Sequence, residues 1–281
     1  MSFILFQTAL LCEILASGGF IVYIIKQKKW MFRVSHWLLF SGFMFHTGFL
    51  IYRFWTLGTA PVLDMRSALS FFSWCIIAVY MAFYLKFRMM VLGSFVAPFA
   101  AFILLISSSM PTKAIHVRPV FKSMWLTIHV FSVFIGIGLF TIACLVSIMY
   151  LIQEYHIKKK KYGSFYFSRL PSLATLDEIN YCALIYGFPF LTIGIISGCI
   201  YAQCAFGTYW QWDPKEVLSL ITWLLYAVLL HERLTVGWQG RKAAIMSILC
   251  FLVIMISFAG TGLFLGGYHS FSSMNTGRMP K

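Results

Sequence analysis

The sequence predicts an all-α fold, a polytopic bundle of about eight transmembrane helices with both termini outside. Hydrophobic residues make up 60% of the chain and charged residues only 11%, against roughly 45–50% and ~25% in soluble domains. Apolar stretches of the ~20 residues that a bilayer requires recur along the whole chain. They leave no room for a separate globular domain, so residues 1–281 are predicted to form a single integral membrane domain.

The apolar stretches give the order of the helices. The first has no basic segment before it and no small-residue cleavage site after it, so it is interpreted as a span rather than a removed signal peptide. No internal repeat is apparent. The predicted spans are residues 3–25, 35–57, 67–85, 89–108, 125–152, 179–204, 216–234 and 243–266.

The net charge of +14 would suggest nucleic acid as the partner of a soluble protein, but in a membrane protein the distribution of the charge matters more. No nucleic-acid partner is expected. Alternate loops hold fourteen of the 22 basic residues, which predicts that these loops are cytoplasmic. The longest, residues 153–178, is expected to lie on the lipid surface. The inner loops contain Lys26, Lys28, Lys29, Arg33, Lys86, Arg88, Lys158 to Lys161, Arg169, Arg233, Arg241 and Lys242.

Seven cysteines are scattered, mostly within apolar spans, and none forms a CxxC pair. Neither a disulfide framework nor a zinc site is therefore predicted.

A tryptophan-rich loop at residues 205–217, predicted to lie outside, has two interpretations. Trp and Tyr are common at membrane interfaces, and Asp213-Pro214-Lys215-Glu216 is a good helix start. Alternatively, the rings of Tyr209, Trp210 and Trp212 form a platform for a large planar apolar ligand. We call residues 205–217 the tryptophan loop.

The string GTYWQWDPKE at Gly207 to Glu216 resembles the WWD signature of the CcsA/CcmC heme-handling family of cytochrome c biogenesis proteins. Chain length, span number and the position of His129 resemble its CcsA members. Phe206 replaces a Trp that often opens the signature, and Met65-Arg66-Ser67 stands where Tyr-Glu-Ser is common. The resemblance continues through Trp223, Tyr226, His231, Arg233, the GWQGRKAA run at Gly237 to Ala244, and the GLFLGGYHSF run at Gly262 to Phe271.

The resemblance implies that His129 and His269 are the two outer axial ligands of heme b, held against Trp210 and Trp212. Neutral imidazoles on opposite faces suit a low-spin heme iron. Without the resemblance, each histidine would be interpreted as a polar anchor at the interface. Tyr209 and Asp213 are included in the candidate site, although Asp213 is better explained as a helix cap.

Two further histidines are predicted at membrane depth. His231 follows Glu216 by fifteen residues, about 22 Å along a helix, and resembles the family's transmembrane heme ligand, whose partner ligand comes from a CcsB (ResB)-like subunit. His46 either serves that inner site or contacts a neighbouring helix. Glu232 either orients His231 or pairs with Arg233.

The resulting hypothesis is heme presentation for thioether attachment to the CxxCH motif of an apocytochrome c, as a subunit of a holocytochrome c synthase. Heme export through His231 is compatible with it. The alternative is a HemX-like protein that regulates tetrapyrrole synthesis. The resemblance also implies a thiol-reducing thioredoxin-like partner and a bacterial inner membrane, or a thylakoid membrane for a plastid-encoded chain.

Overall fold

Eight long helices make up most of the computed structural model, which describes residues 2–60, 62–111, 119–160, 165 and 167–263. Each is long and apolar enough to cross a membrane, which confirms the prediction of an all-α fold with eight spans. The helices are α1 (Ser2–Lys26), α2 (Lys29–Leu57), α3 (Met65–Phe87), α4 (Gly93–Ser109), α5 (Met124–Lys158), α6 (Leu173–Phe206), α7 (Pro214–His231) and α8 (Arg241–Leu263).

Helices α5 and α6 are longer than predicted and include parts of the expected inner loop 153–178. Helix α5 continues to Lys158, and the Lys158 ammonium pairs with Glu154 one turn earlier at 2.7 Å. Helix α6 starts at Leu173, because the Ser172 hydroxyl accepts a hydrogen bond from the Thr175 N–H and caps the helix. Polar local interactions thus extend both helices beyond the apolar stretches that predicted them.

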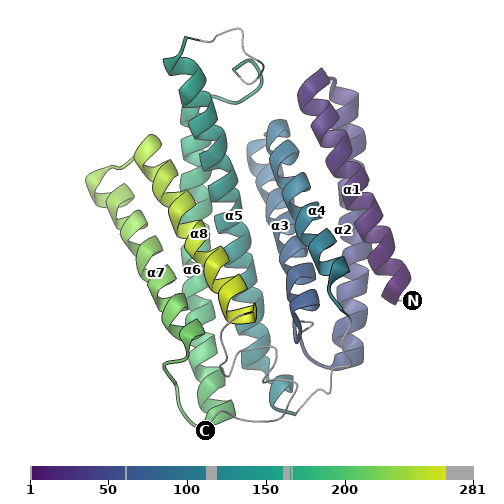
Figure 1. Ribbon diagram of the computed structural model, residues 1–281, viewed down its shortest axis with the longest axis vertical. Coiled ribbons are helices and arrows are strands. Elements are labelled where there is room, and N and C mark those ends of the chain that lie inside the picture. The colour runs from purple at the N-terminus through teal and green to yellow at the C-terminus, as the bar shows by residue number, and fades with distance from the viewer. Residues whose placement is uncertain (1, 61, 112–118, 161–164, 166, 264–281) are drawn as a thin grey trace.

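The helices form two units of four with the same packing pattern. In the first unit (α1–α4), α1 packs on α2 and α4, and α3 packs on α4. In the second unit (α5–α8), α5 packs on α6 and α8, and α7 packs on α8. Helix α3 packs against α5 and joins the units, which lie side by side in Figure 1. We call the end with the tryptophan loop, at the bottom of Figure 1, the outer end.

Sequence matches accompany this shared packing pattern, so the expectation of no internal repeat is wrong. Helices α2 and α6 both end at a left-handed glycine, Gly58 (φ 66°) and Gly207 (φ 79°). The next helices, α3 and α7, both begin after an aspartate cap. Identical residues share one offset, the 149 positions from Asp64 to Asp213, and include Gly58/Gly207, Thr59/Thr208, Asp64/Asp213, Leu69/Leu218, Ser70/Ser219, Trp74/Trp223 and Val79/Val228.

One tryptophan in each unit makes the same type of contact. The Trp74 indole N–H on α3 donates to the Thr47 hydroxyl on α2 at 2.8 Å. The Trp223 indole N–H on α7 donates to the Thr192 hydroxyl on α6 at 2.9 Å. The shared hydrogen bond supports treating α3 and α7 as counterparts.

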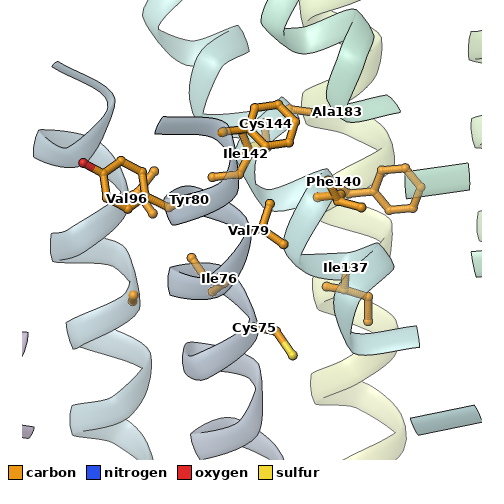
Figure 2. Close-up of a cluster of buried hydrophobic side chains, with 14 of the residues drawn as sticks. Cys75, Ile76, Val79, Tyr80, Val96, Ile137, Phe140, Ile142, Cys144 and Ala183 are labelled. Atoms are coloured by element: carbon orange, nitrogen blue, oxygen red, sulfur yellow. The ribbon is translucent and has the colours of Figure 1, made fainter. Parts of the chain in front are cut away.

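The two most buried helices, α3 and α5, pack together where the two units meet. Figure 2 shows buried side chains of α3, α4, α5 and α6 packed there, including Cys75, Tyr80 and Phe140. A Cβ built on Gly138 of α5 would lie 3.3 Å from the Cys75 carbonyl oxygen. The small residue therefore brings α3 and α5 into close backbone approach, as is common between membrane helices.

Candidate functional site

The tryptophan loop is held by caps at both of its ends. The Gly207 N–H donates to the Gln203 carbonyl at 3.0 Å and closes α6. At the start of α7, the Asp213 carboxylate accepts from the Lys215 N–H at 2.8 Å, with Pro214 in the first turn. Glu216 completes the capping box. The predicted helix start is confirmed.

Glu216 has a larger role than the sequence suggested. Its Oε2 accepts from the Gln211 N–H at 2.8 Å and from the Asp213 N–H at 3.3 Å. One carboxylate thus fixes two backbone positions on either side of Trp212. The loop is a defined structure whose backbone is set by the first turn of α7.

The rings of the loop form a corner rather than one flat platform. Trp210 is half-buried and meets Trp212 edge to face, at 6.1 Å between centroids and 85° between planes. Trp212 is 76% exposed and Tyr209 is 61% exposed. Trp212 also has a φ of 58°, a conformation that costs a non-glycine residue about 1–2 kcal/mol. Strained backbone conformations cluster at functional sites, so the conformation that exposes this ring marks the loop as a candidate site.

His129 lies near the outer end of α5 and faces α6. Its Nδ1 is 2.7 Å from the Gly194 carbonyl oxygen. Because a carbonyl can only accept, Nδ1 carries the proton and Nε2 has the lone pair, which is the tautomer that binds a metal. A Cβ built on Gly198 would lie 2.7 Å from Nδ1, so the glycine makes room for the ring.

His129 and the tryptophan loop do not lie at the same depth. Gly198, against which the histidine packs, precedes Gly207 by nine residues, or roughly 13 Å along α6. A ligand that contacts both must extend along the outer part of α6. The other predicted outer ligand, His269, lies outside the described residues, since the described part of α8 ends at Leu263.

Lys215 is the basic side chain nearest in sequence to the rings. It is half-buried at the start of α7. Arg66, at the same position of α3, instead donates to the Met110 carbonyl at 3.3 Å and lies over the Phe6 ring. Among the described outer cations, Lys215 is the one placed on the tryptophan loop.

His231 is the last residue of α7 and is exposed on the surface of the chain. A five-residue π-helix, Glu232–Val236, follows it. Such π turns are rare and often occur at functional sites. That His231 lies at membrane depth stays a prediction; the structure places its side chain on the surface of the chain and not inside the bundle.

The arginine next to His231 anchors this turn to α6. Arg233 is 8% exposed. Its Nη1 donates to Asn180 Oδ1 at 2.7 Å, and its Nη2 donates to Asp177 Oδ2 at 2.8 Å. The suggested pairing of Glu232 with Arg233 is therefore wrong, because the guanidinium faces α6.

The anchor continues into α5 and α8. The Asn180 amide donates to the Ala143 carbonyl and to the hydroxyls of Ser147 and Ser247, at 2.8–3.1 Å. Asp177 Oδ1 accepts from the Gly240 N–H at 2.9 Å. We call Asp177, Asn180 and Arg233 the inner clamp. The only sequence signal for it was the presence of polar residues three positions apart in a helix.

His46 belongs to a second buried cluster, at the middle of the first unit. Its Nδ1 lies 3.0 Å from Glu13 Oε1 and its Nε2 lies 2.9 Å from the Ser70 hydroxyl. His46 and Glu13 are both fully buried, and the Ser73 hydroxyl adds a bond to the Ala100 carbonyl. Of the two interpretations of His46, the structure shows the helix contact, which ties α1, α2, α3 and α4 together.

Eight apolar helices, two buried polar clusters and an exposed aromatic loop define a polytopic membrane protein with a candidate ligand site at its outer end. The family described as Cytochrome C assembly protein matches residues 62–269. The chain belongs to this family.

Relatives agree with the assignment. The chain is 37% identical over 241 residues to "Cytochrome c biogenesis protein CcsA" of Chlamydomonas reinhardtii, across 80% of this chain and 65% of that protein. It is 35% identical to the CcsA of Guillardia theta, across 78% of each chain. The chain thus spans just under two thirds of the Chlamydomonas relative.

A solved structure shares the fold. "Cytochrome c Heme Lyase CcmF" matches 92% of this chain and 49% of its own length, with a TM-score of 0.61 and 14% identity. The chain spans about half of that protein. At this identity the likeness shows the arrangement of helices and nothing finer.

Proposed function

We propose that the protein binds heme b at its outer end and presents it to an apocytochrome c for covalent attachment. The observation that carries the proposal is His129, whose Nδ1 is fixed by Gly194 so that Nε2 has the lone pair that iron needs. His129 lines the part of α6 that leads to the tryptophan loop. Membership of the cytochrome c assembly family and the printed names of its relatives support heme as the ligand.

In this proposal each residue has a defined role. His129 and His269 are the axial ligands, Trp210 and Trp212 contact the macrocycle from two directions, and Tyr209 covers its edge. Lys215 is the cation available to a propionate. Asp213 caps α7 and does not touch the ligand. Its role is to fix the loop that does. His46 is left out, because both of its ring nitrogens have protein partners.

The chemistry takes place between heme, as substrate, and the acceptor. The thiol of each CxxCH cysteine adds across a heme vinyl group, so that sulfur bonds to one carbon and hydrogen to the other, with no net oxidation. The histidine of the motif then takes an axial position, and His129 or His269 must leave the iron. The protein's contribution is to hold and orient heme, as a subunit of a holocytochrome c synthase.

A second activity, heme passage across the bilayer, is supported by His231. It is a polar side chain on the outward face of a membrane helix, where an unpartnered polar group is costly. A CcsB-like membrane subunit would supply the second ligand of this inner site. A thioredoxin-like protein would keep the acceptor cysteines reduced, in a bacterial inner membrane or a thylakoid membrane.

The absorption spectrum of the purified full-length protein with its membrane partner tests the outer site. We expect a reddish preparation with a bis-imidazole spectrum, and replacement of both ligands (His129→Ala with His269→Ala) should remove at least about 90% of the heme, because iron loses both axial bonds. His156→Ala, at the inner end of α5, is the matched control and should keep the spectrum.

A colourless wild-type preparation would overturn the proposal. His231→Ala separates the two activities, since loss of all heme supports passage through the inner site and unchanged outer loading refutes it. The HemX-like alternative predicts that cells lacking the protein still make mature cytochrome c but accumulate abnormal amounts of tetrapyrrole precursors.

A further inference from the structure

The two units differ in what covers their third helix. Helix α3 of the first unit is covered by α5. Phe71 of α3 contacts Phe131 and Phe134 of α5 at 4.9 and 5.3 Å between ring centroids. Farther inward, the Gly138 position of α5 lies against Cys75 and Val79. In consequence α3 presents a buried stripe to its neighbour, made of Phe71, Phe72, Cys75 and Val79.

The corresponding stripe of α7 is uncovered. The offset that aligns the two outer loops and Trp74 with Trp223 places Leu220, Ile221, Leu224 and Val228 opposite the four residues of the α3 stripe. These four side chains are 37%, 42%, 49% and 51% exposed, whereas those of the α3 stripe are 0–7% exposed. Figure 1 shows α7 at the edge of the bundle, on the far side from the first unit.

We propose that this α7 stripe (Leu220, Ile221, Leu224 and Val228) is the docking surface for one transmembrane helix of a different membrane protein. The helix would take the place that α5 takes on α3. Helices α3 and α5 start at the same end of the bundle, so the docked helix runs parallel to α7. Its residue opposite Leu224 is small, as Gly138 is opposite Cys75.

The position of His231 favours a protein over lipid. On a helix, residues 224, 228 and 231 lie on one face, so the exposed imidazole continues the apolar stripe. A polar side chain facing hydrocarbon is costly unless another protein group meets it. Lipid chains offer no hydrogen-bond partner.

A second copy of this chain is a poorer fit. Repeating the α3–α5 contact between copies would place the first unit of one copy on α7 of the next. That arrangement is head-to-tail and does not close in a dimer. A distinct chain can occupy the surface without forming a ring or an open array. The inference rests on the part of the proposed function that concerns a membrane partner. It does not depend on heme binding.

Photocrosslinking in native membranes tests the surface. A benzoylphenylalanine is placed at Leu220 or Val228, the two ends of the stripe, in the full-length chain. We expect adducts with one apolar segment of a second protein. Because the docked helix runs parallel to α7, Leu220 should reach that segment near its N-terminal end and Val228 nearer its C-terminal end. Ile193 and Ile196 on α6 are the matched controls, because they are 47% and 56% exposed and belong to the counterpart of α2, which is similarly uncovered.

Adducts with lipid alone, with another copy of this chain, or in the reverse order along the segment would each overturn the proposal. A second measurement uses Leu224→Trp, which should lower the adduct yield at Val228 about tenfold, since added volume disrupts a packed helix contact. Ile196→Trp should leave the yield unchanged. Equal yields in the two variants would also refute the docking surface.

The heme spectrum of the same samples keeps the two proposals separate. Heme bound without crosslinks refutes only the α7 surface. Crosslinks in the expected order without heme refute only the heme assignment.

Discussion

The outer loops of the two units have the same length and the same end caps, but they differ in whether their side chains are buried or exposed. Residues 58–64 and 207–213 have equal length, start at a left-handed glycine and end at an aspartate cap. In the first loop Ala60 and Leu63 are buried, and the Thr59 hydroxyl donates to the Phe121 carbonyl in the segment before α5. The second loop exposes Tyr209 and Trp212. The shared caps are therefore a property of the fold, whereas the exposed rings are the part of the loop that the proposed function uses.

The buried polar clusters of the two units differ in their position along the helices. The first unit has its Glu13–His46 pair in the middle of the helices, whereas the second has the inner clamp at the helix ends, beside His231. Both clusters join four elements. Only the inner clamp includes a residue close in sequence to the proposed site, Arg233 beside His231, so breaking it should affect stability and function together.

The largest expected effect is that of Arg233→Ala. It leaves Asp177 and Asn180 without their cation, and removing one partner of a buried pair costs 3–5 kcal/mol. We expect about 3 kcal/mol, because the Asp177 side chain is 20% exposed. Thermal unfolding in detergent measures the loss. Arg233→Lys should lose less, since it keeps the charge, and an Arg233→Ala protein that melts like wild type would contradict the clamp.

A matched pair of cap variants compares the two loops directly. Asp64→Ala and Asp213→Ala each remove an aspartate that accepts a backbone N–H, from Ser67 and from Lys215 respectively. Each should lower the free energy of unfolding by about 1 kcal/mol. Only Asp213→Ala should also lower heme retention in the absorption spectrum. Equal heme loss in both variants would mean that the second loop has no special role.

The parts of this structure that could be predicted from sequence are those that depend on neighbouring residues. Apolar length predicted eight spans, and the order Asp213, Pro214, Glu216 predicted the start of α7. Both depend on a few consecutive positions. The corner formed by Trp210 and Trp212 could not be predicted, because it depends on the backbone angles of one residue.

Contacts between helices that are distant in the sequence could not be predicted. Glu13 bonds His46, 33 positions away. An ion pair between Arg233 and the adjacent Glu232 was one expectation, but Arg233 pairs with Asp177, 56 positions away. A single sequence does not tell which helix faces meet. The internal repeat could not be predicted because its identities are spread over long apolar helices, and the shared caps depend on backbone conformation.

The smallest expected effect on stability is that of Trp212→Gly, which separates the strain at this position from the ring. Trp212 has a positive φ, whereas its counterpart Leu63 does not. Glycine adopts this conformation without cost but loses more entropy on folding, so the free energy of unfolding should rise by no more than about 1 kcal/mol. Heme retention should nevertheless fall severalfold, because the most exposed ring of the loop is gone.

Two companion variants complete this test. Trp212→Phe keeps a ring and the strain, and should retain most of the heme while gaining no stability. Leu63→Gly removes a buried side chain from a relaxed position, so it should destabilise the protein by about 2–5 kcal/mol and leave the heme spectrum of the folded fraction unchanged. If Trp212→Gly lowers stability as Leu63→Gly does, Trp212 packs like its counterpart and is not a displayed ring.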